Sequence, residues 1–204
     1  MALAGGGIVW QKEFFSMALA GWWHSLVKGI SFNGFYNSRN PVARALEWGR
    51  FRKILAMAKL KGNESILDFG CGAQALKEVL PKGCKYVGYD IVSEYSDTKD
   101  YTRLKGVDVV FSLSVFEHLS PEDLDSNLKA FKKMGVKRLV VELPREDSSV
   151  NRFGSWLFGL EFDHAVNHKL GWREAIKIID RHFSCIDFKN RAFISWVSTW
   201  GARA

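Results

Sequence analysis

Ile66-Leu67-Asp68-Phe69-Gly70-Cys71-Gly72 is a short apolar run that ends in a pair of glycines. Its apolar half predicts a buried strand, and Gly70 ends that strand. Glycines between a strand and a helix let the backbone approach a ligand closely. Because ligands of an open α/β sheet bind at the carboxyl ends of its strands, we expect a cofactor at this turn.

Strands and helices alternate on both sides of the turn. Pro41 can open a helix that runs to Leu60, and Ser120 stands at the N-cap position of another helix, with Asp123 three residues on. Further strands are expected at 85–91, 107–113 and 137–143, helices at 73–80, 121–134 and 171–183, and an antiparallel hairpin from 185–188 and 193–200 with its turn at 189–192. These units predict an α/β, doubly wound sheet that is mostly parallel, has a C-terminal antiparallel strand and is covered on both faces.

Two carboxylates accompany the glycines. Asp90 ends the next expected strand, where it can accept hydrogen bonds from the ribose hydroxyls of a nucleoside. The spacing Gly70-x-Gly72-x-x-Ala75 also fits the dinucleotide fingerprint, so a nicotinamide cofactor stays open at this point. Asp68 argues against that cofactor, because its charge would repel a pyrophosphate and attract the α-ammonium group of S-adenosylmethionine (SAM).

Four segments, taken together and in order, resemble the class I SAM-dependent methyltransferases. LDFGCG at 67–72 looks like their first motif, and YVGYD at 86–90 resembles the ribose-binding motif. VDVVFSLSVFEHL at 107–119 is similar to the motif after the fourth strand, and the spacing of Asp97 from Asp108 resembles that of the aspartate that meets the adenine amino group. The resemblance covers about Pro41 to Trp200 and implies a Rossmann-like fold, with SAM as the cofactor.

The same resemblance implies which residues contact SAM. Asp68, Gly70 and Gly72 would contact the methionine moiety, and Asp90 would bind the ribose. Ile91 and Asp97 would contact the adenine. The backbone of Leu113 and Ser114 would make further contacts to SAM, with Phe116 packed nearby.

The sequence departs from the family pattern in two places. Gln74 stands where the family usually has a third glycine, so either the turn is less tight or Gln74 itself contacts the cofactor. The stretch from Ser93 to Asp97 is too short for the usual second helix. That shortening also makes the choice of Asp97 over Asp100 depend on the alignment of this loop.

The composition is that of an ordinary globular domain with a net charge of +7. An odd, sparse set of cysteines (Cys71, Cys84 and Cys185) suits a reducing cytosol, and we expect a cytoplasmic protein. Because the Lys and Arg residues are scattered along the chain, the basic charge favours a solvated surface with no specific partner, although nucleic acid, anionic lipid or an acidic substrate stays open. No RNA-binding module or target-base motif supports a nucleic-acid acceptor.

The first 40 residues form a separate, aromatic-rich extension, and the methyltransferase-like domain spans 41–204. We expect a helix over 8–30 and a loop up to Pro41. Phe14 to Val27 lacks charged side chains but is shorter than the roughly 20 residues that a membrane span needs. A signal peptide is not expected either, because Lys12 is offset by Glu13 and the apolar run continues past the Ala18-Leu19-Ala20 site.

Histidines are the candidates for a general base, which is needed only if the acceptor must lose a proton. His118 follows Glu117 in the strand-four motif, whereas His164 and His168 lie in a loop that borders the acceptor pocket in the family. The i, i+4 spacing of these two could place two ligands on one helical face. The segment is not the metalloprotease motif, however, and we expect no metal.

Aromatic residues outside the expected sheet bear on the acceptor. They form two clusters: Phe14, Phe15, Trp22 and Trp23, and then Phe153, Trp156, Leu157, Phe158, Leu160 and Phe162. The clusters could pack on each other or on a second chain. They could also form a lid over a small, apolar or lipid-linked acceptor, or a peripheral membrane contact. A catalytically silent SAM-binding scaffold and an NAD-dependent oxidoreductase are the alternative functions.

Overall fold

The computed structural model describes residues 41–145, 168–191 and 195–203. The expected helix over 8–30, the two aromatic clusters and His164 lie outside the described residues. The boundary drawn at residue 40 therefore stays a prediction.

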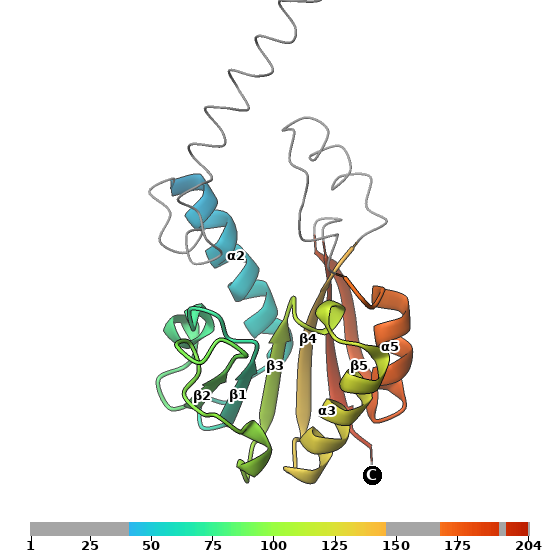
Figure 1. Cartoon of the computed structure of the whole chain (residues 1–204). Helices are drawn as coiled ribbons and strands as arrows, with labels where there is room; N and C mark the ends of the chain where they lie inside the picture. The colour runs from blue at the N-terminus through green and yellow to red at the C-terminus, as the bar shows by residue number, and fades with distance from the viewer. Residues whose placement is uncertain (1–40, 146–167, 192–194, 204) are drawn as a thin grey trace, which may run out of the picture.

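A single six-stranded sheet forms the centre of the described structure, in the order β2-β1-β3-β4-β6-β5 (Figure 1). Four parallel strands are β1 (Ser65–Phe69), β2 (Lys85–Tyr89), β3 (Val109–Leu113) and β4 (Arg138–Pro144). β6 (Ser195–Ala202) runs antiparallel to both β4 and β5 (Phe183–Arg191). The predicted fold class and hairpin are confirmed, but β5 continues through Arg191, so the turn does not begin at 189.

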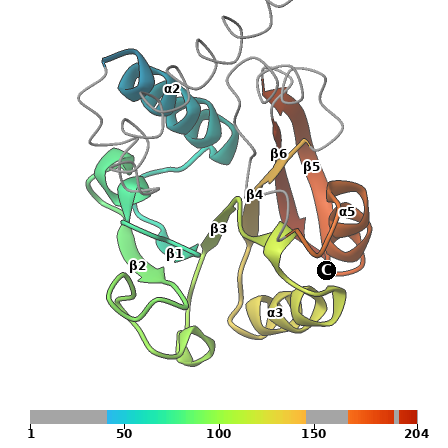
Figure 2. The same ribbon diagram turned by 45° about the horizontal axis from the view of Figure 1, so that its top comes forward.

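Helices lie on both faces of the sheet (Figure 2). α2 (Pro41–Ala58) covers one face, and α3 (Pro121–Lys133) and α5 (Trp172–Asp180) cover the other. The Ser120 hydroxyl accepts a hydrogen bond from Asp123 N at 3.0 Å, which confirms the predicted N-cap of α3. Among the described helices, none is both long and apolar enough to span a membrane.

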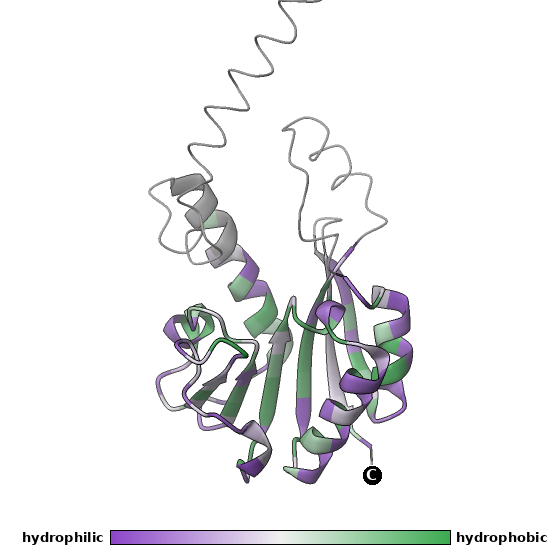
Figure 3. Ribbon diagram, in the orientation of Figure 1, coloured by the Kyte–Doolittle hydropathy of each residue, from purple (hydrophilic) through white to green (hydrophobic). Residues whose placement is uncertain are grey.

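Each sheet face has its own apolar core, because alternate strand residues point to opposite sides. Leu67, Val110 and Leu139 belong to the core under α3 and α5. Ile66, Phe111 and Val140 belong to the core under α2. Figure 3 shows largely hydrophobic strands in the sheet, and both hydrophilic and hydrophobic residues along the helices. The two cores hold the carboxyl ends of the parallel strands at one edge of the sheet.

The prediction of an α-helix over 73–80 is wrong. The structure has only a short 3-10 helix there, η2 (Ala75–Val79). Gln74 adopts a left-handed conformation immediately before it, with φ 60°, and Leu80 is extended because Pro81 follows. Too few residues remain between these two breaks for a stable α-helix. In the loop after β2, a second 3-10 helix, η3 (Tyr101–Arg103), is the only helix, as the short loop predicted.

Candidate active site

The glycine turn follows β1 and is tied to β2. The amides of Gly70 and Cys71 both donate to the Tyr89 carbonyl, at 2.7 and 3.0 Å. Gly70 has φ 81°, and a Cβ there would lie 2.2 Å from a Val115 methyl group, so a side chain cannot be accommodated. A Cβ at Gly72 would meet nothing within 4 Å. The turn is therefore closed against the segment after β3 and open at Gly72.

Asp90 holds this turn through its carboxylate. Oδ2 accepts from Gly72 N and Oδ1 from Val92 N, both at 2.9 Å. The ribose contact implied by the family resemblance would use the remaining lone pairs, since each carboxylate oxygen can accept two hydrogen bonds. Ile91, the expected adenine contact, is 92% exposed.

The side chains of Gln74 and Asp97 are hydrogen-bonded to each other. Gln74 Nε2 donates to Tyr95 O at 2.9 Å and to Asp97 Oδ1 at 3.0 Å, and Gly88 N donates to Asp97 Oδ2 at 2.8 Å. Burial raises the pKa of Asp97, but these hydrogen bonds outweigh it and the pKa is lowered. Gln74 thus retains the left-handed backbone of a glycine and uses its side chain to fasten the loop after β2.

Asp100 has a different position. Its side chain caps η3 by accepting from Thr102 N at 3.0 Å, and it pairs with Arg103 at 2.9 Å. Of the two aspartates, only Asp97 is connected to the glycine turn, through Gln74.

Asp68 is a buried carboxylate beneath the turn, with only 4% of its surface exposed. Burial raises its pKa to about 7, and the nearby Asp90 charge acts in the same direction. A 2.9 Å hydrogen bond from the Tyr86 hydroxyl and the positive charge of Arg50 oppose the shift. A cation bound at the turn would favour the ionised form of Asp68.

A buried ion pair connects α2 to β4 on the same face of the sheet. Arg50 donates to Glu142 Oε2 through Nε at 2.7 Å and through a terminal nitrogen at 2.5 Å. Glu142 Oε1 accepts from the Ser195 hydroxyl at 2.7 Å. This group is not among the residues predicted from the sequence. Its signal was a glutamate within the apolar strand run KRLVVEL, because a buried charge needs a partner.

The segment after β3 places the remaining expected SAM contacts. Leu113 ends β3, and Ser114 has a left-handed φ of 59°. Ser114 N donates to the Glu142 carbonyl at 3.0 Å, which leaves the Ser114 carbonyl as its backbone group for a ligand. Phe116 is fully buried, with its ring 6.3 Å from that of Phe69, so its position is that of a core residue.

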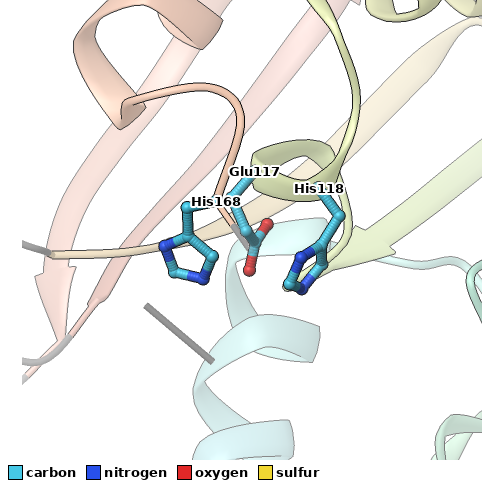
Figure 4. A group of neighbouring side chains, drawn as sticks. All are labelled: Glu117, His118 and His168. Atoms are coloured by element: carbon cyan, nitrogen blue, oxygen red, sulfur yellow. The ribbon is translucent and has the colours of Figure 1, made fainter. Parts of the chain in front are cut away.

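Two of the three candidate histidines lie together. The rings of His118 and His168 are 5.2 Å apart, with Glu117 between them (Figure 4). The Glu117 carbonyl accepts from Lys169 N at 2.8 Å and from Leu170 N at 3.2 Å. These backbone hydrogen bonds bring together segments that are about fifty residues apart. The i, i+4 spacing in the sequence pairs His168 with His164, whereas the structure places His168 beside His118.

An aromatic stack lies at the carboxyl end of β4. The Trp196 ring is 4.9 Å from Phe188 and 5.2 Å from Trp172, and the Arg145 guanidinium lies over it at 5.2 Å. Trp196 pairs with Leu143, near the end of β4. This stack is not one of the two aromatic clusters noted in the sequence, because contacts between β5, β6 and α5 cannot be predicted from local spacing.

A family model described as a methyltransferase domain matches residues 42–183. No curated protein matches the chain.

Solved structures share the fold at low sequence identity. The PH0226 protein from Pyrococcus horikoshii OT3 has a TM-score of 0.63 and 16% identity, over 88% of this chain and 99% of that chain. A SAM-dependent methyltransferase from Aquifex aeolicus has a TM-score of 0.57 and 15% identity, over 75% and 89% of the two chains. The magnesium protoporphyrin IX methyltransferase from Synechocystis PCC 6803, with bound SAH, has a TM-score of 0.54 and 17% identity, over 91% and 100%.

Proposed function

Since the chain belongs to the family of methyltransferase domains, we propose that it binds SAM at the glycine turn and methylates an apolar acceptor beside the aromatic stack. Its activity is SAM-dependent methyl transfer, and the acceptor is the part that we propose. The observation that carries the cofactor site is the open space at Gly72 above the buried carboxylate of Asp68. The sulfonium of SAM supplies an electrophilic methyl group, so the protein contributes mainly positioning and exclusion of water.

Each part of the turn suits one part of SAM. Asp68 would pair with the α-ammonium group and then lose its own proton to solvent, because a neighbouring cation favours the carboxylate. Asp90 would accept from the ribose hydroxyls while it holds Gly72. Ile91 would lose its exposed surface against the adenine ring.

The two alternative functions have weaker support. For an NAD-dependent oxidoreductase, a pyrophosphate at the turn would meet the charges of Asp68 and Asp90. For a silent scaffold, the signs in the sequence are Gln74 in place of a glycine and the missing second helix. Gln74 adopts the left-handed backbone that a glycine would supply, so its presence does not argue against a working cofactor site.

The aromatic stack supports an apolar acceptor, either small or lipid-linked. Trp172, Phe188 and Trp196 are half-buried and lie at the same edge of the sheet as the glycine turn. Large rings in this position offer apolar surface with few rotamers to restrict. Trp196→Ala should leave SAM affinity unchanged and reduce turnover of apolar phenols and alcohols more than that of polar ones. Equal turnover by the variant would contradict this acceptor class.

The cofactor assignment is tested by calorimetric titration with S-adenosylhomocysteine (SAH), the demethylated product, and with NADH. We expect SAH to bind and NADH not to bind. Asp90→Ala should weaken SAH binding about tenfold to a hundredfold, because a charge-assisted hydrogen-bond pair contributes roughly 1.5–3 kcal/mol. Asp100→Ala is the matched control and should bind as the wild type does, since Asp100 serves η3. A folded Asp90→Ala variant with wild-type affinity would refute the assignment.

A further inference from the structure

Glu117, His118 and His168 bring one carboxylate and two imidazoles together outside the glycine turn. Their candidate ligand atoms all lie within 4.8 Å of one another. Figure 4 shows the Glu117 carboxylate between the two rings, so that all three side chains face a common space. Glu117 is only 2% exposed, whereas His118 is exposed and His168 half-buried. The cluster is thus anchored at its base and accessible from solvent.

We propose that these three residues bind one divalent first-row transition metal ion, with Zn²⁺ as the model ion. Two imidazoles and one carboxylate form a donor set that suits Zn²⁺ and its neighbours, while Mg²⁺ and Ca²⁺ prefer oxygen ligands alone. With metal–ligand bonds of about 2.1 Å, tetrahedral ligand atoms lie about 3.4 Å apart, so small side-chain rotations close the site. Three protein ligands leave a fourth position open, as in catalytic zinc sites.

The backbone prearranges these ligands. The Glu117 carbonyl accepts from the amides of Lys169 and Leu170, which fixes His168 beside the 3-10 helix η4 (Phe116–His118). His118 N donates to the Val115 carbonyl at 3.0 Å within the same turn. The backbone is therefore hydrogen-bonded at His118 itself and immediately after His168. This reduces the backbone entropy that would be lost when a metal binds.

The metal site adjoins the proposed cofactor and acceptor sites. Val115, two residues before Glu117, is the residue whose methyl group a Cβ at Gly70 of the glycine turn would meet. Trp172 of the aromatic stack follows His168 by four residues. The three metal ligands are therefore close along the chain to residues of both proposed sites.

A role for the metal in methyl transfer rests on the proposed function, whereas metal binding itself does not. A hydroxyl oxygen of the acceptor would take the open coordination position, where the metal lowers its pKa and its proton passes to solvent. The oxygen then forms a bond to the methyl carbon while the carbon–sulfur bond breaks, and the electron pair of that bond stays on sulfur. The products are a methyl ether, SAH and the released proton.

The test is calorimetric titration of the full chain with Zn²⁺ after a chelator has removed bound metal. We expect one ion per chain. His118→Ala and His168→Ala should each lower the affinity at least about a hundredfold, since even the loss of an outer partner of a ligand costs tenfold to a hundredfold. Glu117→Gln keeps the size of the buried side chain and should also weaken binding. His182→Asn is the matched control, because His182 pairs with Asp125 at 2.6 Å, and it should bind Zn²⁺ as the wild type does.

SAH titration of the same preparations reports on folding and separates the two proposals. SAH affinity should be unchanged in every variant, since no cofactor contact is altered. Wild-type Zn²⁺ affinity in the folded double variant His118→Ala/His168→Ala would overturn the metal site, as would a wild-type chain that binds no Zn²⁺. If the wild type binds Zn²⁺ but not SAH, the proposed function fails and the metal site stands.

Discussion

Asp68 couples cofactor recognition to pH. Its pKa of about 7 in the folded chain lies above the ordinary value of 3.8, and burial is the main cause. Between these two values the native state keeps a proton that the unfolded chain releases. Unfolding free energy should therefore fall as pH rises from about 4 to 7. Above pH 7 the protein contains a buried carboxylate whose desolvation is offset only in part by the Tyr86 hydroxyl and the Arg50 charge, and a bound cation would stabilise it further.

Asp68→Asn should remove the loss of unfolding free energy that the buried charge causes above pH 7. An amide does not ionise, and it can still accept a hydrogen bond from the Tyr86 hydroxyl. At pH 8 we expect the ligand-free variant to be about 1–2 kcal/mol more stable than the wild type, or about 2–8 °C higher in Tm. At pH 4 the difference should vanish, and SAM affinity should be lower in the variant. Melting curves at the two pH values check this. An equal difference between the variant and the wild type at the two pH values would contradict it.

Ile91 allows the contribution of one residue to SAM affinity to be measured without a change in stability, because its side chain is 92% exposed and is not part of either core. Ile91→Ser should leave the Tm within about 1 °C, since exposed substitutions usually change stability little. SAM affinity should fall about fivefold, which corresponds to roughly 1 kcal/mol of apolar surface no longer covered by adenine. Ile186→Ser, at another exposed isoleucine, is the control. Equal affinity for both variants would place the adenine elsewhere.

At the scale of elements, α2 is fixed to the sheet by the Arg50–Glu142 pair. Glu142→Gln should destabilise the fold by about 3 kcal/mol, because it leaves the largely buried Arg50 charge without its main partner. The double variant Arg50→Met/Glu142→Leu should lose less than Glu142→Gln does, since no unpaired charge remains. Urea unfolding of the wild type, the single variant and the double variant measures the order of their stabilities. A double variant that is the least stable would show that the pair itself stabilises the fold.

The strands and the long helices could be predicted because their signals are local. Apolar runs marked β1, β3 and β4, and Ser120 with Pro121 marked the start of α3. The helix expected over 73–80 failed because the conformation of Gln74, which interrupts it, depends on hydrogen bonds to Tyr95 and Asp97 across the loop.

The site was predictable only in part for the same reason. Asp68, the two glycines and Asp90 lie beside the strands that the sequence located, so their positions at one edge followed from the topology. Arg50 with Glu142, and His118 with His168, meet through tertiary packing over separations of fifty residues or more. Residue spacing along the chain contains no information about such pairs.

At the scale of the whole molecule, every proposed cofactor contact lies within the described residues. The residues of the two cores run from Phe51 to Trp200, and the proposed SAM contacts run from Asp68 to Phe116. The first 40 residues are therefore expected to act on the acceptor rather than on SAM. Their aromatic composition, with Trp22 and Trp23 among them, suits a lid over an apolar substrate.

A truncated chain that begins at Pro41 should thus keep wild-type SAH affinity and lose turnover of apolar acceptors. The reason is that a lid excludes water from the transfer site without touching the glycine turn. Calorimetry with SAH and turnover of the acceptor panel, each beside the full-length chain, give the two readings. Trp22→Ala/Trp23→Ala in the full chain is the companion variant, and it should reproduce the loss of turnover without shortening the protein. Lost SAH affinity in a folded truncation would assign the extension to the cofactor site. Unchanged turnover would contradict the lid and show that the extension has only a packing role.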